Sequence, residues 1–179
     1  RYGENPHQDA GVYIEPNNHE NNLLNATIHQ GKQLSYNNLN DADGTLATLR
    51  EFNEPACVVV KHANPCGVAT GENILEVFKR AYNADAMSAF GGLIAINREC
   101  TKEIAEEITK VFAEIVMAPN YEDGALEIFT KKKNLRVIEL GEMNPIENKQ
   151  EIKYIDGGLL VQDIDTHVIN KEDLNFVTE

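Results

Sequence analysis

The chain has 179 residues, a length that suits one domain with its own hydrophobic core. Apolar residues make up 42% of it, and no apolar run approaches the roughly 18 residues of a membrane-spanning helix. Sixteen basic residues against 29 acidic ones give a net charge of −13, which argues against nucleic acid and anionic membranes as partners, because both require a basic surface. Three cysteines without paired spacing argue against a disulfide framework and favour a reducing cytoplasm.

The two ends of the sequence carry no signals of their own. It opens on "RYGENPHQ", without an initiator Met or a signal-peptide pattern, and it closes on "EDLNFVTE". We therefore expect Arg1 to be a boundary within a longer protein. We expect the polar residues 163–179 to connect to a further part of it.

Strands and helices alternate from about residue 38 to residue 140, and this pattern predicts an α/β domain with a largely parallel sheet. The expected elements, in chain order, are strands at 11–15 and 22–30, a helix at 37–52, a strand at 56–60, a helix at 72–83, a strand at 91–96, a helix at 101–115, a strand at 115–119, a helix at 121–133, a strand at 135–140 and two strand segments within 151–163. A polar connector is expected at 141–150.

Several details of these elements are specific enough to check. We expect Asn38 or Asp41 to cap the first helix, and Gly44 to weaken it by about 1 kcal/mol relative to Ala. We expect Lys131–Lys133 in the last turn of the helix at 121–133, where the helix dipole favours cations. Residues spaced by three and four predict the buried helix faces: Leu39, Ala42, Leu46 and Leu49; Ile74, Val77, Phe78 and Ala81; Ile104, Ile108 and Val111.

The stretch "ACVVVKHANPCG" carries the strongest chemical signal. Its β-branched run is typical of a strand buried on both faces, and Lys61 and His62 follow at the carboxyl end, where open α/β sheets bind ligands. Pro65 and Gly67 indicate a turn, which would let both side chains reach one cleft. Histidine suits proton transfer near neutral pH, and a neighbouring lysine would keep it neutral and stabilise an oxyanion. A solvated loop is the simpler alternative for such a pair.

Cys66 allows two further hypotheses. It can be a catalytic thiol with His62 as its base, or a ligand of a zinc site like that of nucleobase deaminases. The zinc site would lack ligands, because no second Cys follows at the required spacing and no Glu stands two residues after His62. A small packing residue is the simplest interpretation of Cys66.

Three other places indicate a binding site. "RYGENPHQ" offers Arg1, and arginine binds phosphate well. "DAMSAFGG" places Met87 and Phe90 before a glycine pair, where backbone can approach a ligand and an aromatic ring can stack on it. Glu114 is expected at the end of the helix at 101–115, where it would ordinarily be surface charge.

Five motifs occur together in one order: "RYGENPHQ", "LSYNNLNDADG", "VVVKHANPCGVA", "SAFGG" and "APNYEDGALEI". With them, the chain from Arg1 to about Glu179 resembles the transformylase region of the bifunctional enzymes that couple 5-aminoimidazole-4-carboxamide ribonucleotide (AICAR) formyltransferase with IMP cyclohydrolase. The resemblance implies formyl transfer from 10-formyltetrahydrofolate to the 5-amino group of AICAR, giving FAICAR, which a second domain closes to IMP. It also implies a three-layer α/β/α, cytidine-deaminase-like subdomain, no catalytic metal, and a cytoplasmic homodimer.

The resemblance also implies residue roles. His62 is similar to the general base that takes the proton of the attacking amine, and Lys61 to the partner that stabilises the tetrahedral intermediate. The remaining positions bind substrate (Arg1, Tyr2, Gly91 and Glu114) or the folate (Met87 and Phe90). Arg1 is expected to face the phosphate. Some members have Asp in place of Glu114, so that contact is expected to shift slightly.

The resemblance also implies how the protein is organised into domains. Residues 1–162 are expected to be the first transformylase subdomain, and 163–179 a connector toward a second one, with the cyclohydrolase domain preceding residue 1. We expect the chain alone to be inactive, and the need of the complete enzyme for a monovalent cation stays open. Two alternatives remain: a zinc-dependent nucleobase deaminase, which metal analysis would reveal, and a non-catalytic nucleotide-binding module.

Overall fold

The computed structural model describes residues 2–14, 21–143, 150–167 and 169–177, and the chain divides into two units, residues 1–144 and 145–179. The second unit contains an antiparallel hairpin of β7 (Gln150–Ile155) and β8 (Gly158–Asp163), which confirms the strand pair expected around Gly157, and a short 3₁₀ helix at Lys171–Asp173. Within the described ranges, no helix combines the length and the apolar character that a bilayer crossing needs. The expected connector at 141–150 lies partly outside the described residues, and the boundary at 162 stays a prediction.

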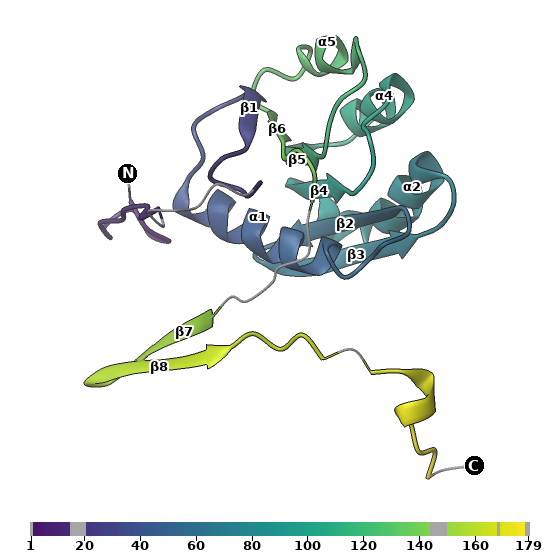
Figure 1. Ribbon diagram of the computed structural model, residues 1–179. Coiled ribbons are helices and arrows are strands. Elements are labelled where there is room, and N and C mark those ends of the chain that lie inside the picture. Colours follow the sequence, from purple (N-terminus) through teal and green to yellow (C-terminus); the bar gives the residue numbers. More distant parts are fainter. Residues whose placement is uncertain (1, 15–20, 144–149, 168, 178–179) are drawn as a thin grey trace. The chain divides into compact units, whose positions relative to one another are not determined.

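The first unit is built on one sheet in the order β1–β6–β5–β4–β2–β3 (Figure 1). Its strands are β1 (Thr27–Gln30), β2 (Ala56–Lys61), β3 (Asn64–Thr70), β4 (Gly92–Ile96), β5 (Ala113–Ala118) and β6 (Arg136–Glu139). Strands β3 to β6 point one way, whereas β1 and β2 point the other way. The expected parallel arrangement is confirmed at β4, β5 and β6, and β2 runs against it.

Helices cover both faces of this sheet. α1 (Tyr36–Leu49) packs on one face, and α2 (Ile74–Ala84), α4 (Lys102–Lys110) and α5 (Ala125–Phe129) pack on the other, while the short α3 (Ala86–Ala89) precedes β4. The three-layer α/β/α architecture predicted from the sequence is therefore confirmed for this unit.

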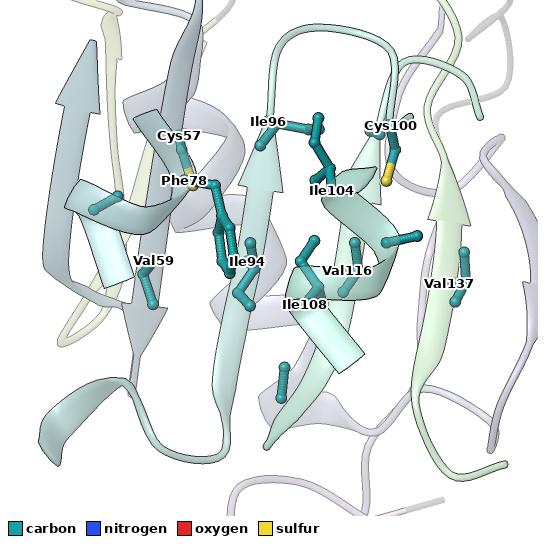
Figure 2. Packing of buried hydrophobic residues seen from close by; sticks show 14 of the residues in the cluster. Cys57, Val59, Phe78, Ile94, Ile96, Cys100, Ile104, Ile108, Val116 and Val137 are labelled. Atoms are coloured by element: carbon teal, nitrogen blue, oxygen red, sulfur yellow. The ribbon is translucent and has the colours of Figure 1, made fainter. Parts of the chain in front are cut away.

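β2 is buried on both faces, as its unbroken apolar run predicts. Cys57 and Val59 pack into the cluster under α2, α4 and α5, and Val58 and Val60 pack into the cluster under α1. Figure 2 shows the first of these clusters, with the ring of Phe78 from α2 between the helices and the sheet. Because burying one such side chain contributes about 1.5–3 kcal/mol, the position of β2 in the sheet is strongly determined.

The start of α1 differs from the expected caps. Ser35 is the N-cap: its side chain accepts a hydrogen bond from the Asn38 backbone N–H at 3.1 Å, and the Asn38 side chain accepts one from the Ser35 N–H at 3.1 Å. Such a reciprocal pair satisfies two backbone donors of the first turn. Asn38 is thus part of the cap without being the cap residue, and Asp41 lies inside the helix, where its side chain is available for other contacts.

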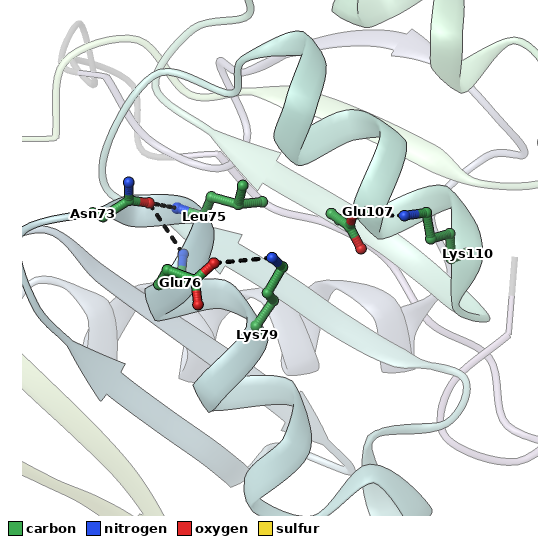
Figure 3. Close-up of polar contacts among 6 residues, drawn as sticks. All are labelled: Asn73, Leu75, Glu76, Lys79, Glu107 and Lys110. Carbon is green, nitrogen blue, oxygen red and sulfur yellow. Dashed lines mark hydrogen bonds and ion pairs between the residues drawn. The ribbon is translucent and has the colours of Figure 1, made fainter.

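α2 forms close to the range expected for it, and surface ion pairs lie on α2 and on α4. The side chain of Asn73 accepts hydrogen bonds from two backbone N–H groups of the first turn (Figure 3). Glu76 pairs with Lys79 at 2.9 Å and Glu107 of α4 pairs with Lys110 at 2.6 Å, both across one exposed helix turn. Because exposed pairs contribute little, the apolar faces fix these helices on the sheet.

The helix expected at 101–115 is shorter than predicted. α4 ends at Lys110, and β5 already begins at Ala113. Around Glu114 the chain alternates between buried and exposed side chains: Ala113 and Ile115 are buried and Glu114 faces outward. This period of two is that of a strand, which the longer helical pattern concealed.

Two other elements are also shorter than expected. Of the helix expected at 121–133 only α5 forms, because Gly124 has a φ of +86°, a left-handed conformation that cannot continue a helix from residue 121. Lys131–Lys133 therefore follow the helix, and their expected place in its last turn is wrong. Of the early strands, only β1 forms, and the described residues 11–14 form none.

The backbone of α2 lies directly against β3 at Gly67. A Cβ atom on Gly67 would meet the backbone oxygen of Ala81 at an impossible distance of 1.9 Å. We predict that Gly67→Ala lowers the free energy of unfolding by about 1–3 kcal/mol, the usual cost of overpacking, in urea unfolding followed by circular dichroism. Gly158→Ala, where nothing lies within 4 Å of the added carbon, is the matched control. Equal stability of the two variants would contradict this packing.

Candidate functional site

Lys61 lies at the end of the sheet where the parallel strands begin. It is the last residue of β2, and β2 is antiparallel to β4, with Val60 opposite Leu93. The end of β2 therefore lies where β4, β5 and β6 begin, at the amino ends of the parallel strands. Lys61 thus lies at the carboxyl end of β2, as expected, but the sequence does not reveal that β2 is reversed and that this end lies beside the amino ends of the parallel strands.

His62 lies in a tight hairpin turn. Lys61 is paired with Asn64, so the connection between β2 and β3 consists of His62 and Ala63 alone. Their φ angles of 53° and 60° are both left-handed, as two-residue hairpins of this kind require, and each costs about 1–2 kcal/mol for a residue other than glycine. Something outside the turn must hold it in this conformation.

The turn indicated by Pro65 and Gly67 is wrong in position. Both residues belong to β3, the edge strand of the sheet. Proline is tolerated there because an edge strand leaves one side of its backbone unpaired, and the register between β2 and β3 shifts at Val59 and Val60. The chain reverses three residues earlier than expected, directly after Lys61.

Lys61 and Gly91 lie next to each other. The Lys61 Nζ donates a hydrogen bond of 2.8 Å to the backbone oxygen of Phe90. A Cβ on Gly91 would lie 3.1 Å from Nζ and 3.0 Å from the ring of Phe112, and Gly91 has a φ of +71°. Its N–H donates to the backbone oxygen of Phe112 at 2.8 Å. Both the backbone conformation and the close neighbours therefore favour glycine at this position.

An apolar surface adjoins this contact. Phe90 is 62% exposed, and its ring centroid lies 5.0 Å from that of Phe112, which is itself half exposed. Met87, in α3, is 90% exposed. The structure thus places Phe90 beside Lys61 and Gly91, and Phe112 is an aromatic neighbour that the sequence analysis did not single out.

Glu114 lies on β5, not at a helix end as expected. Its Oε2 is 3.4 Å from the Nδ2 of Asn38 in α1 and 3.7 Å from the Nη1 of Arg136 at the start of β6. The Arg136 side chain is only 12% exposed, and its Nε donates to the backbone oxygen of Lys32 at 3.0 Å. Side chains from two other elements, α1 and β6, therefore hold this carboxylate at the end of the sheet where β4 and β5 begin.

A basic groove of about 550 Å³ extends from Glu114. We use this name for the groove lined by five cations: Lys32, Lys131, Lys132, Lys133 and Arg136. Such a concentration of positive charge contrasts with the net charge of −13 of the chain and would favour an anionic ligand in the groove. The run of three lysines was the available sequence signal, but it was attributed to the end of a helix.

The N-terminal motif is described only in part. Arg1 lies outside the described residues, and Tyr2 belongs to the loop of residues 2–14, with 36% of its surface exposed. The contacts expected for these two residues stay predictions.

The three cysteines are free thiols in surroundings that disfavour the thiolate. Burial raises the pKa of the Cys66 thiol, although the positive charge of Lys61 opposes this shift, and the Cys66 Sγ lies 3.5 Å from the backbone oxygen of Val59. Burial also raises the pKa of Cys57, and that of Cys100 to about 12. No group of three or more His, Cys, Asp or Glu side chains in the described part of the chain is arranged to hold a metal ion.

The comparisons with known proteins agree with this arrangement of motifs. The model of the AICARFT/IMPCHase bienzyme family matches residues 1–179. The chain belongs to this family. The bifunctional purine biosynthesis proteins PurH of Staphylococcus carnosus and of Acetivibrio thermocellus are each 49% identical to it over the whole chain, which corresponds to 36% and 35% of their own lengths.

The chain thus spans about a third of the length of these curated relatives. Among solved structures, RibD of Acinetobacter baumannii (form 1) is similar over 55% of this chain and 35% of that one, with 12% identity and a TM-score of 0.43.

The raised pKa values predict slow alkylation of all three cysteines by iodoacetamide at pH 7 in the folded chain, because only the thiolate reacts. Cys66 should react first, since it is the only one of the three that is partly exposed, and its rate should rise as the pH rises. Cys57 and Cys100 should react only after unfolding in urea, which exposes their buried thiols. Rapid labelling of Cys66 at pH 6–7 would contradict the prediction and would revive a cysteine nucleophile.

Proposed function

We propose that this chain supplies one part of an AICAR formyltransferase site, in which a formyl group passes from 10-formyltetrahydrofolate to the 5-amino group of AICAR to give FAICAR. The observation that carries the proposal is the meeting of Lys61, Gly91 and Glu114 at one sheet edge, beside the basic groove. Membership of the family and relatives named for bifunctional purine biosynthesis support it.

Formyl transfer requires a general base for the proton of the amine and a positive charge near the developing oxyanion. The amine of AICAR is conjugated with its ring and is a poor nucleophile, so its proton must leave as nitrogen attacks the formyl carbon. We assign His62 to take that proton. Lys61 stabilises the oxyanion of the tetrahedral intermediate and helps to protonate the folate nitrogen, which leaves as its bond to the formyl carbon breaks. Their adjacent positions at the end of β2 suit these two roles.

The basic groove suits the phosphate of the nucleotide. Phosphate is a dianion near neutral pH, and a concave surface lined by lysine and arginine side chains stabilises it. Glu114, at the end of this groove, is placed to accept hydrogen bonds from the nucleotide, and the backbone at Gly91 leaves room for it. We keep Arg1 and Tyr2 as further nucleotide contacts, with Arg1 toward the phosphate.

The exposed apolar residues suit the folate. Met87 and Phe90 offer a surface on which a flat heterocycle can stack, and the ring of Phe112 widens it. Their large exposed areas agree with a pocket that is completed by other parts of the protein. We propose a cytoplasmic homodimer in which residues 1–162 form the first subdomain, residues 163–179 lead to a second, and a cyclohydrolase domain converts FAICAR to IMP. No catalytic metal is part of this proposal.

The catalytic assignment predicts separate effects on rate and binding. In a full-length member of the family that carries this chain, His62→Ala should lower kcat for formyl transfer about 10²- to 10⁴-fold, the usual contribution of a general base, with KM for AICAR changed only a few-fold. Lys61→Ala should lower kcat similarly. His167→Ala, which changes an exposed histidine of the second unit, should have no effect. A normal kcat with weakened nucleotide binding in His62→Ala would instead indicate a non-catalytic binding module.

If the phosphate binds in the basic groove, loss of the groove's lysines should weaken only those ligands that carry a phosphate. Replacing Lys131, Lys132 and Lys133 together by Ala should weaken the binding of AICAR about tenfold or more in calorimetry, because each charged hydrogen bond contributes roughly 1.5–3 kcal/mol. The riboside, which lacks the phosphate, is the matched control and should bind both proteins equally. Equal losses for the two ligands would remove the phosphate from the basic groove.

A further inference from the structure

One side chain outside the sites described so far contacts the turn that carries His62. The Oδ1 of Asp41, in α1, accepts a hydrogen bond of 2.7 Å from the backbone N–H of Ala63. The two residues are 22 positions apart in the sequence, and their contact joins the first helix to the hairpin between β2 and β3. Asp41 belongs to the "LSYNNLNDADG" motif, which the sequence associates only with the start and the buried face of the first helix, and which has no part in the proposed chemistry.

The turn depends on such outside contacts. His62 and Ala63 both have positive φ angles, and neither is glycine, asparagine or aspartate, the residues that usually adopt this conformation. The Asn64 side chain donates to the His62 backbone oxygen at 2.8 Å, and the Asp41 carboxylate accepts from the N–H of the same peptide group, that of Ala63, at 2.7 Å. The side chains of Asn64 and Asp41 therefore bind both polar groups of the peptide between His62 and Ala63.

Helix α1 is shaped to approach the turn. Gly44 lies three residues after Asp41, on the same side of the helix, and a Cβ there would lie only 3.3 Å from the backbone oxygen of Ala63. The glycine in the middle of α1, which costs helix stability, is thus explained by close contact with the turn. Asp41 and Gly44 together bring the helix backbone against Ala63 and leave the carboxylate within reach of its N–H.

We propose that Asp41 is a positioning residue for His62. Its carboxylate holds the left-handed turn and so fixes the place from which the imidazole takes the proton of the substrate amine. This inference rests on the proposed function of His62. A base must lie within hydrogen-bond reach of the proton that it removes, and a displacement of about 1 Å can cost about a hundredfold in rate.

The experiment is a double-mutant cycle in a full-length family member that carries this chain. Kinetic constants for formyl transfer are measured for the parent protein, Asp41→Ala, His62→Ala and the double variant. Asp41→Asn, which keeps an oxygen acceptor for the Ala63 N–H, is the conservative variant. Asp43→Ala, which removes an exposed carboxylate from the same helix, is the matched control. Hydrogen–deuterium exchange of peptides that span residues 61–64 reports the contact itself, independently of activity.

The proposal predicts one pattern. Asp41→Ala should lower kcat about tenfold to a hundredfold with little change in KM for AICAR, and should speed exchange at residues 61–64. Asp41→Asn should recover most of both properties, and Asp43→Ala should change neither. In the His62→Ala background, Asp41→Ala should cost less than about twofold, because a residue that acts only through His62 has nothing left to position.

Other outcomes overturn it in distinguishable ways. Equal losses from Asp41→Ala in both backgrounds would show that Asp41 acts independently of His62, and a loss in Asp41→Asn as large as in Asp41→Ala would show that the hydrogen bond is not what matters. If Asp41→Ala does not fold, Asp41→Asn and the exchange data still decide the question. A normal kcat in His62→Ala alone would refute the proposed function, whereas a loss there with none in Asp41→Ala would refute only this inference.

Discussion

The arrangement of this molecule depends on the burial of one reversed strand. β2 is apolar and buried from Ala56 to Val60 and lies between β4 and β3, covered by helices on both faces. Because it runs against β4, its only polar end, Lys61, emerges where β4 and β5 begin. Hydrophobic burial of Val58 to Val60 thus determines where the cationic side chain lies. A shift of the strand by one residue would exchange its two buried faces and move the site with them.

Close backbone contacts then bring separate elements to this edge. Gly92 can start β4 only without a side chain, since a Cβ would lie 2.7 Å from the backbone oxygen of Val60. Gly91 leaves room for the Lys61 ammonium group, and Gly44 lets α1 approach the turn formed by His62 and Ala63. Glycines so placed allow β2, β4 and α1 to meet within a few ångströms. Near that point, five of the 16 lysine and arginine residues of this acidic chain line one groove, which favours the anionic ligand that we propose.

Much of this fold can be predicted from local patterns. The β-branched run of β2, the glycine pair before β4 and the amphipathic faces of α2 and α4 predict elements that the structure confirms. Strand direction could not be predicted, because a two-residue turn of His62 and Ala63 carries none of the glycine or asparagine signals of a hairpin. The place of Glu114 could not be predicted for a related reason: the helical pattern of α4 continues into β5, in which every residue except Glu114 is buried.

The candidate site likewise has some residues that the sequence reveals and others that only the fold reveals. Lys61, His62 and the glycine pair are recognisable from residue type and spacing, and the family resemblance adds roles for them. The basic groove and the Asp41 contact depend on residues that are far apart in the sequence, such as Lys32 with Lys133 and Asp41 with Ala63. Only the folded chain brings such pairs together, so no local pattern predicts them.

A crystal structure of a full-length protein carrying this chain, determined with bound AICAR, tests the central claim most directly. We predict that the nucleotide lies along the start of β4 and β5, with its phosphate in the basic groove and its amine within about 2.6–3.2 Å of the His62 imidazole. A nucleotide bound away from this edge, or with its amine distant from His62, would contradict the account.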